Sequence, residues 1–206
     1  MPLHLENLSN RYYALRHGQS VPNAQNLIMS DPQEGRKPEY GLTAQGRKQI
    51  LLSLQTALQQ HTFDDQTILI VSSPLSRALE SALIAKDILK PLSDIQIEEG
   101  LRERFFGEFE GQKSSANCYQ KIWDLDKDNF EHTKYNVESV ASVLDREEQV
   151  VRRLETMYKN ISIILCGHGD PLQILETSFR GIHPSQHRTL PTLHNAELRL
   201  LNASAK

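Results

Sequence analysis

The 206-residue sequence has only two cysteines, Cys118 and Cys166, which lie far apart in the chain. This spacing provides neither a zinc knuckle nor a CxxC redox pair. The HExxH pattern of a zinc site is also missing. Cys166 ends an apolar run, which favours a buried thiol. We therefore expect no metal and no other cofactor.

Charge of one sign and long apolar runs are scarce as well. The formal net charge of −3 argues against a nucleic-acid partner bound through a basic face, although it is compatible with a local cationic pocket. No apolar segment approaches the ~20 residues of a membrane span. The N-terminal MPLHLENLSN lacks the basic and apolar regions of a secretory signal. We expect a cytoplasmic protein with no membrane partner.

Internal repeats and low-complexity tracts are absent too. Hydrophobic residues make up 38% of the chain and charged residues 24%, a composition that supports a packed core. We predict one domain over residues 1–206. Residues 112–137 are polar, mixed in charge and weakly patterned, and we expect them to form an inserted loop or small cap.

Short apolar runs alternate with helical patterns through the rest of the chain. The apolar runs predict strands over residues 11–15, 67–73, 94–99, 161–167 and 196–201. Apolar residues at i, i+3 and i+4 predict helices over residues 42–60, 74–90, 138–160 and 170–181. This alternation predicts an α/β fold, a three-layer α/β/α sandwich around a mostly parallel sheet. The helix faces that we expect to be buried include Leu51, Leu58 and Met157.

Three of the predicted strands end in residues suited to binding an anion. The first runs into Arg16-His17-Gly18, the second into a Ser-Ser-Pro turn before Arg77, and the late strand into Gly167-His168-Gly169. Ligands of such sheets bind outside the carboxyl ends of the strands, so we expect these residues to meet. Arg77 would lie in the first turn of a helix, where a cation is unfavourable unless an anion is bound nearby.

This set of residues is suited to phosphoryl chemistry. Two guanidinium groups and a protonated imidazole would bind a phosphoryl dianion, while a second, neutral imidazole could attack phosphorus and form a phosphohistidine. A carboxylic acid from residues 101–111 could protonate the leaving alkoxide and then activate water. The glycines beside the histidines would let the backbone approach a ligand. Because the arginines neutralise phosphate charge, this chemistry needs no metal.

The segments RHG, SSPLSRALESA, LRERFFGEFEG and GHG resemble, in order and spacing, the motifs of the histidine phosphatase superfamily, the phosphoglycerate-mutase-like group. The resemblance spans nearly the whole chain and implies the same sandwich fold. It also implies that His17 is the nucleophile and Glu103 the proton donor, with Glu108 as the alternative donor. The other implied catalytic residues are Arg16, Arg77 and His168, and the implied phosphate contacts are Asn23, Gly169, Gln19 and Ser20.

Several residues near these motifs leave more than one interpretation open. Asp170 either places a carboxylate near the anion or caps the helix and points away. The segments EYGLTAQG and YNVES depart from the family's usual sequences, which weakens any substrate assignment. The remaining histidines match no motif, and we expect surface or structural roles for His4, His61, His132, His183, His187 and His194.

Together these features predict a metal-independent phosphomonoesterase that acts through phospho-His17 on a small phosphorylated substrate, for instance a sugar phosphate or bisphosphate. The short, charge-balanced segment 112–137 favours water over a second substrate as the acceptor. A cofactor-dependent phosphoglycerate mutase is the first alternative. A domain that binds phosphorylated ligands with negligible turnover is the second. The substrate and the oligomeric state, including a homodimer, stay open.

Overall fold

The computed structural model describes residues 5, 8–63, 67–114 and 116–202. Its centre is a five-stranded sheet in the order β3-β2-β4-β1-β5, in which only β5 is antiparallel to its neighbour. The predicted mostly parallel sheet is therefore confirmed. The strands are β1 (Arg11–Arg16), β2 (Ile68–Ser72), β3 (Gln96–Ile97), β4 (Ser162–Gly167) and β5 (Leu198–Leu200).

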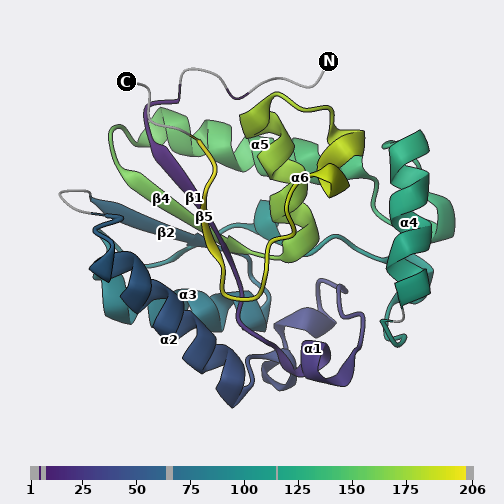
Figure 1. The fold of residues 1–206 in the computed structure, drawn as a ribbon, viewed down its shortest axis with the longest axis horizontal. Coiled ribbons are helices and arrows are strands. Elements are labelled where there is room, and N and C mark those ends of the chain that lie inside the picture. Colours follow the sequence, from purple (N-terminus) through teal and green to yellow (C-terminus); the bar gives the residue numbers. More distant parts are fainter. Residues whose placement is uncertain (1–4, 6–7, 64–66, 115, 203–206) are drawn as a thin grey trace.

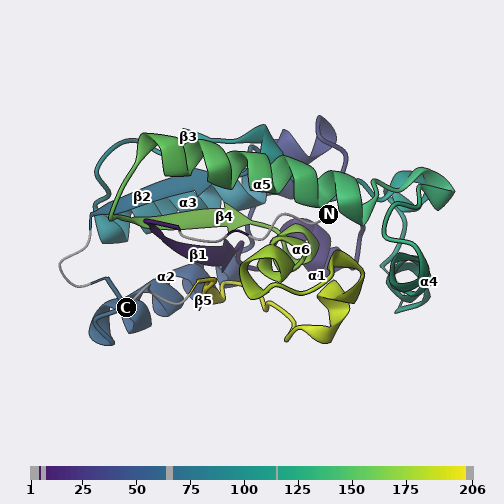
Figure 2. The same ribbon diagram turned by 90° about the horizontal axis from the view of Figure 1, so that it is seen from above.

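Helices cover both faces of this sheet, as the predicted α/β/α sandwich requires (Figures 1 and 2). On one side lie α2 (Ala44–Gln59) and α3 (Ser76–Leu89), and on the other lie α5 (Val140–Met157) and α6 (Gly169–Arg180). All six residues of β4 are buried, because this strand lies between β2 and β1 and has helices on both faces.

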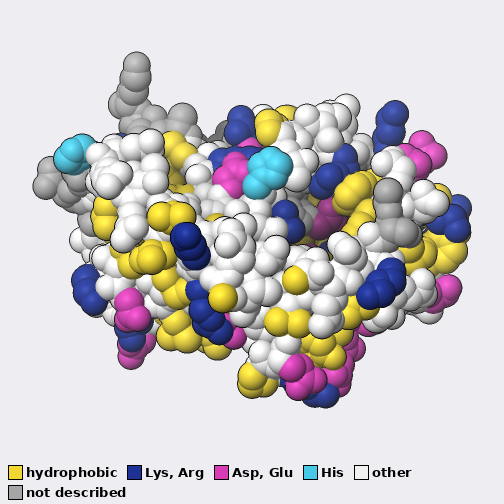
Figure 3. Space-filling model, turned by 60° about the horizontal axis from the view of Figure 1, so that its bottom comes forward, with side chains coloured by type: hydrophobic (Ala, Val, Ile, Leu, Met, Phe, Trp, Pro, Cys, Tyr) yellow, Lys and Arg dark blue, Asp and Glu magenta, His cyan; other side chains and the backbone are white. Residues whose placement is uncertain are grey.

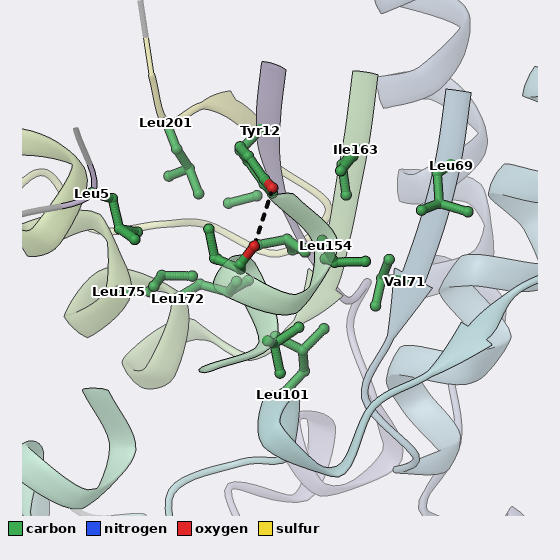
Figure 4. Packing of buried hydrophobic residues seen from close by; sticks show 14 of the residues in the cluster. Leu5, Tyr12, Leu69, Val71, Leu101, Leu154, Ile163, Leu172, Leu175 and Leu201 are labelled. Atoms are coloured by element: carbon green, nitrogen blue, oxygen red, sulfur yellow. Dashed lines mark hydrogen bonds between the residues drawn. The ribbon is translucent and has the colours of Figure 1, made fainter. Parts of the chain in front are cut away.

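Alternate residues of the central strands supply the two halves of the core. Ile163 and Leu165 pack toward α5 and α6, whereas Ile164 and Cys166 pack toward α2 and α3. The expected burial of Cys166 is confirmed. Figure 4 shows the first half, in which strand residues meet leucines from both helices and the Tyr12 hydroxyl donates to the Val151 carbonyl. The period-2 alternation of a strand produces this division.

Three apolar residues that we expected to be buried are exposed. Leu51 and Leu58 of α2 are 40% and 43% exposed, and Met157 is 62% exposed. The buried stripe of α2 is narrow and runs through Ile50 and Leu54. Leu51 and Leu58 each follow a buried residue by one position, about 100° further around the helix, and so face solvent. Met157 is the last residue of α5, where the helix passes the edge of the core.

Residues 112–137 contain a helix, α4 (Ala116–Asp128), which the weak sequence pattern did not predict. It stands at one side of the sandwich, beyond α6 (Figure 1). Ile122 anchors it in a small apolar cluster with Ile28, Phe106 and Val137. The remaining elements are the short α1 (Val21–Gln25) and the 3-10 turns η1 (Glu34–Arg36), η2 (Pro38–Tyr40), η3 (Glu99–Leu101), η4 (Gly107–Phe109), η5 (Lys134–Asn136) and η6 (Pro184–Thr189).

The surface carries charges of both signs. On the face drawn in Figure 3, the described basic and acidic side chains are interspersed, without a broad area of one sign. Within the described residues, no helix has the length and apolarity needed to cross a bilayer. Most of the N-terminal stretch examined for a secretory signal lies outside the described residues, and so does His4.

Candidate active site

The parallel register of the three central strands brings the predicted residues together. Arg16 pairs with Gly167 and Ser72 with Cys166, so β1, β2 and β4 end at the same level of the sheet. The amide of His17 extends the ladder by donating to the Gly167 carbonyl at 3.0 Å. As a result, the ring centroids of His17 and His168 are 5.2 Å apart, with the rings inclined at 62°.

The His17 ring is held in one orientation by two hydrogen bonds. Its Nδ1 lies 2.7 Å from the Gly18 carbonyl, and its Nε2 lies 3.2 Å from Nε of Arg77. A carbonyl accepts and a guanidinium donates, which assigns the ring proton to Nδ1 and the lone pair to Nε2. Burial, with help from the charges of Arg77 and Arg16, holds the pKa of His17 well below its usual range. The imidazole is therefore neutral and nucleophilic at pH 7.

His168 is also neutral in this ligand-free arrangement. Burial, followed by the charge of Arg77, holds its pKa well below the usual range. The protonated imidazole expected from the sequence is thus not found without a ligand, although a bound dianion would raise this pKa. Nε2 lies 2.8 Å from the Ser73 hydroxyl, whose oxygen already accepts from the Leu75 amide. The hydroxyl hydrogen is then free to point at Nε2, which leaves the ring proton on Nδ1.

The two arginines are anchored to carbonyls at one end and have unused donors at the other. Nη1 of Arg16 donates to the Leu193 carbonyl at 2.7 Å, and Nη2 of Arg77 donates to the Met29 carbonyl at 3.0 Å. Among the described residues, Nε of Arg16, Nη1 of Arg77 and Nδ1 of His168 are buried without a hydrogen-bond partner. Buried donors of this kind are costly unless a ligand satisfies them. A tetrahedral anion would accept from all three.

Helix termini add to the attraction for an anion. Arg77 lies in the first turn of α3, as predicted, and α6 begins at Gly169 directly after His168. The N-termini of helices carry partial positive charge and free backbone N–H groups. An anion between the two histidines would compensate the unfavourable placement of Arg77.

Glu103 follows η3 and brings a carboxyl group to the same place. Its Oε2 lies 3.5 Å from Nη2 of Arg77 and 3.6 Å from Nδ1 of His168. Its Oε1 accepts from the Arg104 amide at 3.0 Å. Burial raises the pKa of Glu103 to about 6, with Arg77 opposing this shift and Asp170 adding to it. The alternative donor, Glu108, is exposed on η4 and does not line the cavity described next.

A cavity of about 260 Å³ opens beside this cluster. His17, Arg77 and His168 are almost fully buried and lie behind its lining, where Arg77 and His168 contact Glu103. The cavity contains both charged groups and aromatic rings. The lining residues are Arg16, Asn23, Asn26, Leu27, Glu103, Phe106, Ser114, Tyr119, Trp123, Gly169, Asp170, Gln173, Arg188, Thr192 and Leu193.

The secondary contacts suggested by the resemblance fall into two groups. Asn23 lines the cavity, and its Oδ1 accepts from the Ser20 amide and from Nδ2 of Asn195, which also donates to the His17 carbonyl. Ser20 is the N-cap of α1 and forms a capping box with Asn23. The side-chain oxygen of Gln19 accepts from the Thr43 hydroxyl. Gln19 and Ser20 therefore hold the loop and do not line the cavity.

The two glycines beside the histidines do not serve the same purpose. A Cβ atom on Gly18 would lie 2.3 Å from the Gly46 carbonyl oxygen, so this glycine lets the loop pack against α2 rather than against a ligand. A Cβ atom on Gly169 would lie 3.1 Å from Cζ of Arg16. Gly169 thus makes room for the guanidinium group, and it also lines the cavity.

Asp170 lies in the cavity wall and does not cap α6, whose N-cap is His168. Its carboxylate accepts from Nη1 of Arg104 and Nε1 of Trp123, each at 3.2 Å. Burial by itself would raise the pKa of Asp170. The neighbouring cations, Arg104 first among them, outweigh burial and lower this pKa below its usual value. The second sequence alternative, a carboxylate pointing away from the site, is wrong.

Sequence reasoning missed the side of the cavity formed by α4 and η6. Tyr119 and Trp123 stack with their centroids 5.4 Å apart, and Cζ of Arg188 lies 3.8 Å from the centre of the Trp123 ring. Two signals were available in the sequence: Trp123 is the only tryptophan in the chain, and Tyr119, Ile122 and Trp123 have the i, i+3, i+4 spacing of a helix face.

Two histidines that match no motif have structural positions nearby. Nε2 of His132 lies 2.9 Å from Asp126, and Nε2 of His187 lies 3.7 Å from Asp170. Both rings are buried, in keeping with the structural role expected for them. Over the described part of the chain, no group of three or more His, Cys, Asp or Glu side chains has the arrangement of a metal site.

Comparison with known proteins agrees with this geometry. A sequence model of the histidine phosphatase superfamily (branch 1) matches residues 12–206. The glucosyl-3-phosphoglycerate phosphatase of Mycolicibacterium vanbaalenii is 25% identical over 198 residues, which cover 90% of this chain and 81% of that protein. A Hydrogenobacter thermophilus protein with a provisional phosphoserine phosphatase name is 28% identical over 181 residues, covering 84% and 79%.

Solved structures extend the comparison to the fold. A mycobacterial glucosyl-3-phosphoglycerate phosphatase in complex with VO3 superposes with a TM-score of 0.74 at 21% identity, covering 91% of this chain and 90% of the other. The family model spans almost the whole sequence, including all four motifs. The chain therefore belongs to branch 1 of the histidine phosphatase superfamily.

Proposed function

We propose that the protein is a metal-independent phosphomonoester hydrolase that acts through a phosphohistidine at Nε2 of His17. The observation that carries this proposal is the set of three buried, unpartnered donors on Arg16, Arg77 and His168 beside the lone pair of His17. Together they provide a charge and a geometry suited to a phosphoryl group. The relatives named above are phosphatases, which supports the same reaction class.

In the first step, a phosphoryl oxygen takes over the donor that Arg77 now gives to His17. This exchange frees Nε2 to attack phosphorus in line, while Nδ1 keeps its bond to the Gly18 carbonyl. Glu103, with a pKa of about 6, protonates the oxygen of the departing alcohol. The two arginines and His168 neutralise the charge on the phosphoryl oxygens, with the amide of Gly169 and Asn23 as further contacts.

In the second step, water replaces the alcohol. The ionised Glu103 removes a proton from this water, which attacks phosphorus and releases inorganic phosphate from His17. Each group returns to its starting protonation state, so the cycle needs no further reactant. We propose residues 112–137 as a cap on this site, because Ser114, Tyr119 and Trp123 line the cavity.

Replacement of the nucleophile tests the mechanism. His17→Ala should lower kcat by about 10⁴ or more against an aryl phosphate in EDTA, as for other covalent nucleophiles. His194→Ala is the matched control, because that side chain is exposed outside the cavity, and its activity should equal that of the parent. Retention of activity within tenfold in His17→Ala, or loss of parental turnover on chelation, would contradict the proposal.

Trapping the intermediate separates the remaining alternatives. Rapid quenching of the parent enzyme with a labelled phosphomonoester should yield an acid-labile, alkali-stable phosphoprotein that His17→Ala does not form. Isomerisation of phosphoglycerate that depends on 2,3-bisphosphoglycerate would indicate the mutase alternative. Tight phosphate binding without hydrolysis across a broad panel of phosphoesters would indicate the ligand-binding alternative.

A further inference from the structure

The cavity extends beyond the phosphate-binding groups, between α4 and the segment that follows α6. A phosphoryl group bound beside Arg16, Glu103 and Gly169 occupies the near half of the cavity. The rest of the substrate must then enter the far half, which we call the leaving-group half. Its defining residues are Asn26, Ser114, Tyr119, Trp123, Asp170, Gln173, Arg188 and Thr192.

The two ionic groups of the leaving-group half, Asp170 and Arg188, lie beside each other, and Asp170 is also paired with the buried Arg104 behind the cavity wall. Asp170 accepts from Arg104 at 3.2 Å and lies 3.8 Å from Nη1 of Arg188. Arg104 is fully buried and also makes two hydrogen bonds of 2.7 Å to Asp126. Two guanidinium groups therefore face two carboxylates, and their formal charges cancel.

Arg188 is held in this arrangement from three directions. Its guanidinium lies 3.8 Å over the Trp123 ring, and its Nη1 donates to Oε1 of Gln173 while lying near Asp170. Gln173 is fixed in turn, since its Nε2 donates to the Leu190 carbonyl. A guanidinium group that already interacts with a carboxylate and a ring face gains little attraction from a further anionic partner.

On the basis of the proposed function, we propose that the substrate's leaving group is an uncharged, hydroxyl-bearing alcohol, such as a sugar or polyol. The enzyme discriminates against leaving groups that carry a carboxylate or a second phosphate. A second anion would lie against Asp170 without an unpaired cation, and removing it from water is then uncompensated. Uncharged groups would meet the hydroxyls of Ser114, Tyr119 and Thr192 and the amide of Asn26.

Two substrates that differ in one charged group test this inference. Glycerol 3-phosphate and 3-phosphoglycerate share the phosphate ester, but the second carries a carboxylate in place of a hydroxymethyl group. We expect kcat/KM for glycerol 3-phosphate to exceed that for 3-phosphoglycerate by about tenfold or more, the effect of one unfavourable charge contact at partly screened separation.

Variants of the paired charges should shift this ratio in opposite directions. Asp170→Asn frees Arg188, which lines the cavity, to meet a ligand carboxylate, so the preference should move about tenfold toward 3-phosphoglycerate. Arg188→Gln leaves Asp170 less compensated, so the preference for glycerol 3-phosphate should increase. Any effect of Asp170 on Glu103 acts on both substrates and cancels in the ratio. The control is Asp124→Asn on the exposed side of α4, which should leave the ratio unchanged.

The outcomes separate this inference from the proposed function. Equal or greater kcat/KM for 3-phosphoglycerate in the parent enzyme would overturn the inference while leaving the hydrolase intact. An unchanged ratio in Asp170→Asn and Arg188→Gln would also overturn it. Should Asp170→Asn fail to fold, the parental ratio and Arg188→Gln still decide. Failure to hydrolyse any phosphomonoester, an aryl phosphate included, would instead reject the proposed function.

Discussion

At the residue scale, the site is a balance between burial and charge. Burial keeps His17 and His168 neutral by lowering the pKa of each imidazole, and it raises the pKa of Glu103 to about 6. The same water-poor environment therefore yields two neutral imidazoles, one of them the proposed nucleophile, and a carboxyl group that is easily protonated near neutral pH. Burial thus sets the protonation state of both His17 and Glu103 for the proposed reaction.

The pKa of Glu103 predicts a pH profile. For an alkyl phosphate, kcat/KM should fall as pH rises through about 6, because the free enzyme loses the proton that the leaving alkoxide needs. His17 does not limit the rate there, since its pKa lies well below that range. Glu103→Gln should remove this limb and lower kcat/KM by about 10²–10⁴.

Comparison of the parent enzyme with Glu103→Gln separates the ionisation of the Glu103 carboxyl group from that of the substrate's phosphate, which also occurs near pH 6. A bound dianion raises the pKa of a nearby acid, so the corresponding limb of kcat should lie at higher pH than that of kcat/KM. An alkaline limb that persists in Glu103→Gln would assign it to another group.

Residue chemistry was predictable wherever a strand end supplied the context. His17, Arg77 and His168 follow buried parallel strands, and their convergence follows from that topology alone. The ligand-free charge of His168 was not predictable, because it depends on the depth of burial and on the neighbouring Arg77. Gly18 was misread for a related reason, since the backbone of α2 that it contacts lies 28 residues further along the chain at Gly46.

At the element scale, α5 contains a buried acid that its packing does not explain. Glu147 is fully buried, and among the described residues neither of its carboxyl oxygens has a hydrogen-bond partner. Burial raises its pKa well above the usual range. An unpaired buried carboxyl of this kind weakens the helix's attachment to the core.

Removal of this carboxyl group should stabilise the fold. The unfolded state ionises Glu147 at a lower pH than the folded state does, so stability is lost as pH rises above the unfolded pKa of about 4.3. Glu147→Leu should raise the free energy of unfolding at pH 7 by about 1–3 kcal/mol. Urea unfolding at pH 5 and pH 8 measures both the increase in the free energy of unfolding and the change of that free energy with pH.

Glu147→Gln is the companion variant, because it removes the titration but keeps a polar group. It should reduce the fall in stability between the two pH values while giving less total stabilisation than leucine. If Glu147→Leu proves less stable than the parent at pH 8, the carboxyl group must have a partner that favours its ionised form.

Elements with strong periodicity were predictable, and those held by tertiary contacts were not. The strand at β4 and the helix at α3 were expected within one or two residues of their observed bounds. By contrast, α4 buries little of its apolar surface, and among its described side chains Ile122 is the one large apolar residue that is fully buried. Contacts from Trp123 and Asp126 to distant segments contribute to its placement, and a local pattern cannot reveal them.

At the scale of the whole molecule, Arg104 connects α4, the helix of the proposed cap, to the sandwich. It is fully buried, makes a bidentate ion pair with Asp126 of α4, and donates to Asp170 of α6. Its Nε also donates to the Glu138 carbonyl, just before α5. Two helices and the segment before α5 thus share one guanidinium group.

Loss of this group should affect the entire structure. Arg104→Met leaves two buried carboxylates without their main partner, so the free energy of unfolding should fall by about 3–5 kcal/mol. Circular dichroism would follow the sandwich, and fluorescence of Trp123, the only tryptophan, would follow the cap. Coincident urea transitions would indicate that the two parts unfold as a unit.

Arg152→Met is the matched control for this prediction. Arg152 is exposed on α5 and pairs with Glu148 four residues earlier, an arrangement that contributes about 0.5 kcal/mol or less. A stability change for Arg104→Met as small as that of the control would show that the buried network is not needed to hold the cap.

The strand order has a consequence for the synthesis of this protein. Because β4 lies between β2 and β1, a ribosome must release about four-fifths of the chain before the sheet can close and His168 can face His17. Until then, the hydrophobic strands β1 and β2 have unpaired edges, which favours association with other nascent chains or with chaperones. Premature termination before residue 162 should therefore yield aggregation-prone fragments without residual catalytic activity.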